Sequence, residues 1–213
     1  MADFMWLMRR LKAMSVPEVA WRVSQKAIQK SEEKRFKSRK TAVTETLFNR
    51  KLSALQLAAD RMHLNWDNQC YSLNTEIPLL GRYDYETYKK QWNAGFQTDH
   101  KWPEQFSYAL EYKQRDDIGD ARTNWELNRH FQFALLAKNY AASGDSKYLS
   151  EFTELFQDWN AKNPFLWGIS WTSVMEVAIR CSNWCYAWVF LKGADAPRAL
   201  LNELQTGILN MTD

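Results

Sequence analysis

The chain has 213 residues, of which 46% are apolar and 15% aromatic, enough for the core of one large domain and too apolar for a disordered chain. Only seven Gly and five Pro are present, so turns are few and long helices are favoured, which predicts an all-α protein. The net charge of +3 hides an uneven distribution. Residues 1–51 carry thirteen Lys or Arg against five Asp or Glu, whereas residues 52–213 carry fifteen against twenty. We therefore divide the chain into a basic N-terminal helical segment, 1–51, and a larger acidic region, 52–213.

Several functional classes find no support in the sequence. It has no Gly-rich phosphate loop, no nucleophile elbow and no His or Cys pair at metal-ligand spacing, so we expect no cofactor and no metal. Cys181 and Cys185 lie one turn apart in an apolar stretch, which indicates buried thiols instead of a disulfide. No apolar run has the length of a membrane span. The first ten residues place their charges after the apolar run, the reverse of a secretory signal, so the chain as written is expected to be cytoplasmic.

The first predicted helix spans residues 16–30. Ser15-Val16-Pro17-Glu18 has the spacing of a capping box with a proline in the first turn, and apolar residues follow at helical intervals. A basic run then occupies residues 34–40. A solvated helix end or linker is the simpler interpretation of this run, and a site for an anionic surface is the alternative. We expect no nucleic-acid partner.

Residues 41–101 have a weaker pattern. Residues 52–62 carry a helical apolar face, and Tyr85, Tyr88 and Trp92 indicate another helix. Residues 92–102 are aromatic and polar without periodicity, which predicts an ordered loop that packs on the domain.

From residue 121 onward the helical pattern is strong. We predict four helices joined by short turns, over residues 123–142, 147–160, 173–191 and from 195 towards the C-terminus. The first is apolar on more than one side and should lie between neighbours. Ser143-Gly144-Asp145-Ser146 ends it and caps the next, and Ser173 with Glu176 has the spacing of a second capping box. Such antiparallel pairs form a bundle, a solenoid or an α/α toroid, and the absence of a fixed sequence repeat weakens the solenoid.

Two polar blocks within these helices form the candidate functional site. An indole offers a flat apolar face to a sugar ring, while carboxylate, amide and guanidinium groups reach its hydroxyls or an acidic substituent. Residues 125–130 and 171–180 combine these groups at helical spacing. The candidate substrate-binding residues are Trp125, Glu126, Asn128, Arg129, His130, Trp171, Glu176 and Arg180.

A structural role for the same residues is the alternative. Unpaired burial costs about 1 to 3 kcal/mol for each polar group, so these groups either line a wet cavity or satisfy one another. Glu126 is spaced to pair with Arg129 or His130 along one helix, and for this block both interpretations stay open. For Glu176 and Arg180, a bridge that holds the preceding loop to the helix is the simpler interpretation.

These blocks resemble the N-terminal helical region of the heparinase II/III family of bacterial polysaccharide lyases. The matching segments are Asp120-Ala121-Arg122, the block at 125–130, Trp159, Asn163-Pro164, Gly168-Ile169-Ser170-Trp171, Glu176-Val177-Ala178-Ile179-Arg180, the start at 11–23 and the loop at 92–103. The resemblance implies that residues 52–213 are part of an incomplete α/α toroid, which in this family is followed by more helices and a β-sandwich. It also implies export to the periplasm as an alternative to the cytoplasm.

The resemblance implies cleavage of uronic-acid polysaccharides, such as glycosaminoglycans, by β-elimination. In that reaction an amide or similar donor neutralises the uronate carboxylate while a Tyr or His removes the C5 proton. The family's asparagine lies in an Asn-His motif downstream of residues 176–180, and its Tyr and His follow later, beyond Asp213. We therefore assign no catalytic residue. We expect an N-terminal portion of a lyase that is inactive alone, whose partners are an acidic polysaccharide and the C-terminal part of the same protein.

A different class of function stays open beside the lyase. The basic segment at residues 26–51 could make the chain a non-catalytic helical module that binds an anionic polymer or a membrane surface.

Overall fold

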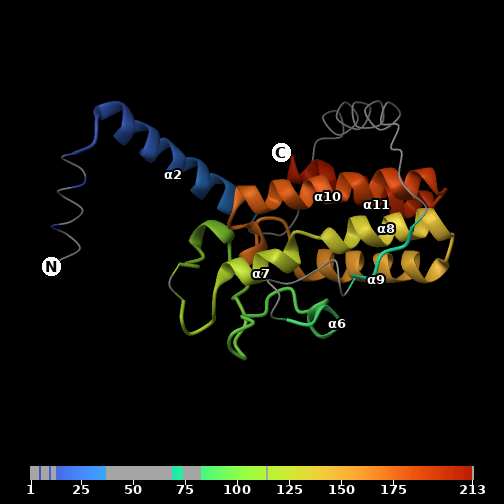
Figure 1. Ribbon diagram of the computed structural model, residues 1–213. Helices are drawn as coiled ribbons and strands as arrows, with labels where there is room; N and C mark the ends of the chain where they lie inside the picture. The colour runs from blue at the N-terminus through green and yellow to red at the C-terminus, as the bar shows by residue number, and fades with distance from the viewer. Residues whose placement is uncertain are drawn as a thin grey trace. The chain divides into compact units, whose positions relative to one another are not determined.

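The structure is a computed structural model and describes residues 5, 10, 13–36, 69–73, 83–113 and 115–212. The chain divides into two compact units, residues 1–40 and residues 41–213. Every named element in the described ranges is an α-helix or a 3-10 helix, and the extended pairing there is limited to two isolated bridges (Figure 1). The predicted all-α class is therefore confirmed. No helix in these ranges is both long enough and apolar enough to cross a membrane.

The first unit contains the helix α2 (Val16–Phe36). It starts where the capping box predicts, since the Glu18 amide donates to Ser15 Oγ at 3.4 Å. It extends past the predicted end at residue 30, because no Gly or Pro in the following residues interrupts a helix. Lys34 and Arg35 lie in its last turn, where the helix dipole favours cations.

The second unit is built on four long helices. They are α8 (Phe131–Ser143), α9 (Ser146–Lys162), α10 (Val174–Gly193) and α11 (Arg198–Met211). Helix α8 lies between α9 and α10, and α11 packs on α10 (Figure 1). This position explains why α8 is apolar on several sides, and Phe133, Leu136 and Ala137 are completely buried. The helix pairs agree with the predicted architecture, and the toroid itself stays a prediction.

The turn between α8 and α9 follows the prediction. Gly144 ends α8 with a φ of 69°, a left-handed conformation that glycine adopts without strain, and its amide donates to the Tyr140 carbonyl at 2.8 Å. The Asp145 carboxylate then accepts from the Lys147 amide at 3.0 Å and caps α9. The two helices are consequently tightly joined.

The single helix predicted over residues 123–142 is wrong, because two helices occupy this range. Helix α7 (Ala121–Asn128) ends before Arg129, and α8 starts at Phe131. His130 between them has a φ of 62°, in the left-handed region that a residue with a side chain adopts at a cost. Its ring is completely buried and stacks on Phe133 with centroids 4.3 Å apart, so packing offsets the strain.

The region before α7 contains the short helix α6 (Tyr85–Tyr88) and the loop at residues 92–102. The helix predicted through Trp92 is therefore only one turn long. Trp92 and Trp102 are both buried, which confirms a loop packed on the domain. The helix predicted over residues 52–62 lies outside the described residues.

Candidate functional site

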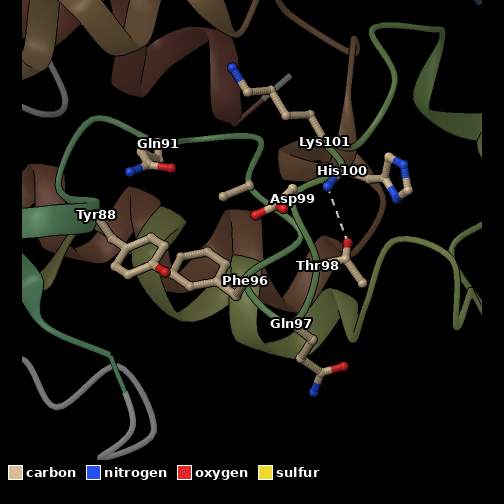
Figure 2. A pocket seen from close by; sticks show the side chains of 9 residues that line it. Tyr88, Gln91, Phe96, Gln97, Thr98, Asp99, His100 and Lys101 are labelled. Carbon is tan, nitrogen blue, oxygen red and sulfur yellow. Dashed lines mark hydrogen bonds between the residues drawn. The ribbon is translucent and has the colours of Figure 1, made fainter.

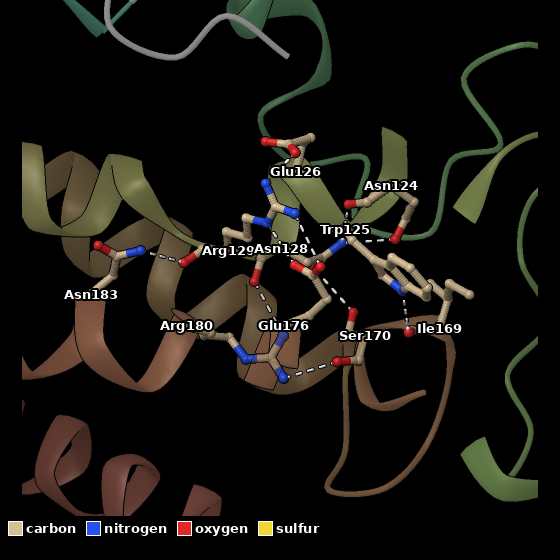
Figure 3. Close-up of polar contacts among 10 residues, drawn as sticks. All are labelled: Asn124, Trp125, Glu126, Asn128, Arg129, Ile169, Ser170, Glu176, Arg180 and Asn183. Carbon is tan, nitrogen blue, oxygen red and sulfur yellow. Dashed lines mark hydrogen bonds and ion pairs between the residues drawn. The ribbon is translucent and has the colours of Figure 1, made fainter. Parts of the chain in front are cut away.

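The two candidate blocks meet at one end of the helix pairs. Helix α7, the 3-10 helix η2 (Ile169–Trp171) and the first turns of α10 converge there (Figure 3). Five of the eight candidate residues are buried, namely Asn128, His130, Trp171, Glu176 and Arg180. The other three, Trp125, Glu126 and Arg129, are partly exposed. The structure thus brings the blocks together and separates them into a buried set and an outer edge.

Asn128 is the centre of the buried set. Its Nδ2 donates to the Trp92 carbonyl at 2.9 Å and to Asn124 Oδ1 at 2.9 Å. Its Oδ1 accepts from Trp159 Nε1 at 2.8 Å and from Ser170 Oγ at 3.0 Å. The amide group is fully used within the protein, so it joins the loop, α9 and η2 to α7.

Arg180 crosses the same region from α10 and forms no ion pair with a described residue. Its Nη1 donates to the Asn128 carbonyl at 3.1 Å and its Nη2 to the Ser170 carbonyl at 2.9 Å. The guanidinium lies between the rings of Trp159 and Trp171, 4.8 Å from each centroid. Burial lowers the pKa of Arg180 to about 9, so the group stays charged at neutral pH. Its positive charge lies at the C-terminal end of α7, where the helix dipole favours a cation.

Arg129 is held between two carboxylates. Its Nε and Nη2 donate to the two oxygens of Glu176 at 2.6 and 3.0 Å, and its Nη1 donates to Glu126 (Figure 3). The Glu176 side chain is 2% exposed, whereas those of Arg129 and Glu126 are 21% and 22% exposed. The hydrogen bonds to Glu176 raise the pKa of Arg129, which therefore stays charged.

Two predicted pairings of Glu176 are wrong, and one prediction for Glu126 is confirmed. Arg180, four residues along α10, bonds to carbonyl groups and leaves Glu176 to Arg129. The capping box is also not formed, since the Ser173 side chain makes no capping hydrogen bond and Glu176 turns towards α7. The predicted pair of Glu126 and Arg129 within one helix is present.

The His130 side chain is completely shielded from solvent. Trp184 Nε1 donates to its Nδ1 at 2.8 Å, which places the ring proton on Nε2, and this buried atom has no hydrogen-bond partner. Burial and then the charge of Arg180 hold the pKa of His130 well below its ordinary value, so the ring is neutral. A neutral, enclosed imidazole is suited to packing and not to proton transfer with a bound sugar.

Polar residues outside the eight candidates complete the network. Asn124 donates to the Trp92 and Ala94 carbonyls at 2.8 and 3.0 Å, and Asn183 donates to the Arg129 carbonyl at 2.8 Å. Ser170 also bonds to Asn163 Oδ1 at 3.1 Å. An available signal was the i, i+4 spacing of two asparagines on an otherwise enclosed helix. Within the described ranges, no three His, Cys, Asp or Glu side chains cluster in a way that could hold a metal ion.

Comparison with known proteins identifies the family of the chain. The family described as heparinase II/III N-terminus matches residues 29–210, and the chain belongs to this family. A heparin-sulfate lyase of Bacteroides stercoris is 41% identical over 49 residues, which are 23% of this chain and 7% of that protein. The chain therefore matches only a small part of the length of this curated relative. No solved structure is significantly similar to the chain.

Proposed function

We propose that this chain is the N-terminal helical portion of a polysaccharide lyase that cleaves uronic-acid-containing polysaccharides by β-elimination. The observation that carries the proposal is the family match over residues 29–210. The relative whose name is heparin-sulfate lyase supports a sulfated, acidic polymer as the substrate class. In this proposal the helices form one wall of the substrate cleft and a C-terminal part of the same protein provides the catalytic groups.

The proposed reaction requires groups that the buried set of candidate residues does not offer. A base removes the C5 proton, the bond from C4 to the leaving oxygen breaks, a C4–C5 double bond forms, and an acid protonates the oxygen. A donor at the uronate carboxylate stabilises the charge that develops there. His130 is buried and neutral, and Asn128 uses its whole amide internally, so neither serves as base or donor.

The candidate residues then have two roles. Trp125, Glu126 and Arg129 are accessible, so an indole, a carboxylate and the edge of a guanidinium meet the polysaccharide. The buried residues act through them and position the outer edge; they are Asn128, His130, Trp171, Glu176 and Arg180. Because Arg129 already pairs with two carboxylates, it directs Glu126 towards sugar hydroxyls more than it binds an anion itself.

Incubation of the chain with heparan sulfate, alginate and hyaluronan tests the proposal. We expect binding without a rise in the ultraviolet absorbance of unsaturated uronates. The Glu126→Gln substitution should weaken binding about tenfold, the effect of one lost charge-assisted hydrogen bond. Arg198→Gln, at an exposed position at the start of α11, is the control and should leave binding unchanged. Turnover by the chain would contradict the proposal that it lacks the catalytic groups. A failure to bind any of the three polymers would contradict the proposed substrate class.

A non-catalytic module for an anionic surface is the second candidate, and α2 supports it. This helix exposes apolar side chains at Val16, Trp21, Val23 and Ile28. Exposed apolar side chains on the same helix as Lys34 and Arg35 suit an anionic membrane surface. Charge reversal at Lys34 and Arg35 that abolishes ligand binding, while substitution of Arg180 leaves it intact, would favour this second function over the lyase.

A further inference from the structure

A pocket of about 300 Å³ lies beside α6 and within the loop at residues 92–102 (Figure 2). None of the eight candidate residues lines it. The side chains that matter for its chemistry are Tyr88, Gln91, Phe96, Thr98, Asp99 and Lys101. Its size is at the lower end of the range for small-molecule sites, which suits a single ring.

The apolar side of the pocket is a pair of aromatic rings. Tyr88 and Phe96 stack with centroids 4.7 Å apart and an interplanar angle of 23°. Tyr83 meets both rings edge-on, at 5.4 and 5.0 Å. Phe96 has a φ of 62°, a strained conformation for a residue with a side chain, and this conformation accompanies the packing of its ring against Tyr88. Phe96 is buried and supports the partly exposed Tyr88, so the Tyr88 ring is the part of this pair that can meet the apolar face of a pyranose ring.

The polar side of the pocket carries an amide, a carboxylate and an ammonium group. Gln91, Asp99 and Lys101 are among the residues that line the pocket (Figure 2), and all three are exposed. Lys101 forms no ion pair with another described residue, and Gln91 uses one amide hydrogen on the Thr87 carbonyl at 3.0 Å. These groups can bond to ring hydroxyls, and the ammonium group can bond to an acidic substituent.

The loop that forms the pocket is fixed before any ligand binds. A Cβ at Gly95 would lie 2.1 Å from the Ile118 carbonyl oxygen, so the two backbones are in close contact. Thr98 Oγ1 donates to the same carbonyl at 2.7 Å, and His100 Nδ1 lies 2.7 Å from the Asp117 carbonyl. An antiparallel bridge joins Ala94 to Lys101. A preformed site loses little conformational entropy on binding, which favours a genuine ligand site.

We propose that this pocket is a secondary subsite for one residue of an acidic polysaccharide. The sugar ring packs on Tyr88, whose ring is supported by the buried Phe96, while Gln91 and Asp99 bond to its hydroxyls and Lys101 binds its sulfate or carboxylate. The nature of the polymer rests on the proposed function. The subsite would bind the polysaccharide at a distance from the bond that is cleaved. It would therefore favour long substrates over short ones.

Titration of the chain with tetrasaccharides of heparan sulfate and of hyaluronan tests this subsite, with amide resonances observed by NMR. The two ligands separate sulfate from carboxylate recognition, and cellotetraose serves as the neutral comparison. We expect shifts at residues 88–101 and about tenfold weaker binding for Lys101→Gln, the loss of one charge-assisted bond. Tyr88→Leu should weaken binding similarly, whereas the exposed controls Lys113→Gln and Tyr186→Leu should bind as the unmodified chain does. Circular dichroism checks that each variant is folded.

Three outcomes would overturn the subsite. If the acidic ligands shift only the resonances of residues 125–129 and Lys101→Gln has no effect, the subsite fails and the proposed function stands. If cellotetraose binds as tightly as the acidic ligands, acidic recognition at Lys101 is contradicted. If neither acidic tetrasaccharide binds anywhere on the chain, the subsite and the proposed substrate class fail together.

Discussion

Arg129 at the end of α7 donates two hydrogen bonds to Glu176 in the first turn of α10, and this pair joins polar blocks 47 residues apart in sequence. Arg180, on the same helix as Glu176, is nearer to it in the sequence. That arginine is already bonded to the carbonyls of Asn128 and Ser170. The choice of partner is therefore made by the surrounding network and not by helical spacing.

The energetic coupling of Glu176 and Arg129 is the first prediction. Arg129→Gln leaves a nearly buried carboxylate without its partner and should lower the free energy of unfolding by about 3 kcal/mol. A double-mutant cycle with Glu176→Gln, followed by urea unfolding, should give a coupling of about 1 to 3 kcal/mol. The exposed pair of Lys90 and Glu154 is the control and should give less than about 1 kcal/mol. Equal coupling in the two pairs would refute a special role for the first.

Asn128 provides the second prediction. Asn128→Ala removes bonds to the Trp92 carbonyl, Trp159 and Ser170 at a completely enclosed position, so we expect a loss of about 3 kcal/mol or more in the free energy of unfolding. Asn202→Ala, at an exposed position on α11, should change it by less than about 0.5 kcal/mol. Urea unfolding measures both, and similar small losses would show that Asn128 is not a structural centre.

The third prediction concerns the planar group of Arg180. Arg180→Lys keeps the charge but loses the flat guanidinium between Trp159 and Trp171 and one of its two carbonyl bonds. We expect a loss of about 2 kcal/mol in stability and a changed tryptophan fluorescence spectrum. Arg198→Lys should alter neither quantity. A spectrum and stability unchanged by Arg180→Lys would mean that any buried cation suffices.

His130 makes stability depend on pH, and this is the fourth prediction. Its folded-state pKa lies well below 6.5, so below that pH the unfolded chain binds a proton that the folded chain excludes. Stability should be complete well above pH 6.5 and fall as the pH drops below it, with a slope that approaches about 1.4 kcal/mol per pH unit while the folded-state ring stays neutral. His130→Asn removes the titration and retains a residue that tolerates the left-handed conformation, so the slope should disappear. A slope that persists in His130→Asn would place the effect elsewhere.

The helix pairs could be predicted from sequence because local signals define them. Gly144 and Asp145 join α8 to α9 by turn and cap chemistry that depends only on neighbouring residues. The break at His130 could not be predicted in this way. Apolar spacing continues across it, and the left-handed backbone is stabilised by rings from distant segments, such as Trp184.

The sequence indicated which polar segments meet in the fold, but not how their side chains are arranged. Tryptophans beside charged residues pointed to the segments that do meet, including Arg129 and Glu176. Burial is a property of the whole fold, so the sequence could not separate Asn128, which is enclosed, from Glu126, which reaches the surface. The pocket beside Phe96 was also beyond sequence reasoning, because a loop without periodicity reveals no neighbours.

The proposed function depends above all on recognition of an acidic polysaccharide. Equilibrium titration of the chain with size-defined heparan sulfate and with a neutral glucan, at several salt concentrations, tests it most directly. We predict saturable binding of heparan sulfate that weakens as salt rises, with no binding of the glucan. Equal affinity for both polymers, or no affinity for heparan sulfate at low salt, would contradict recognition of a sulfated, acidic polysaccharide.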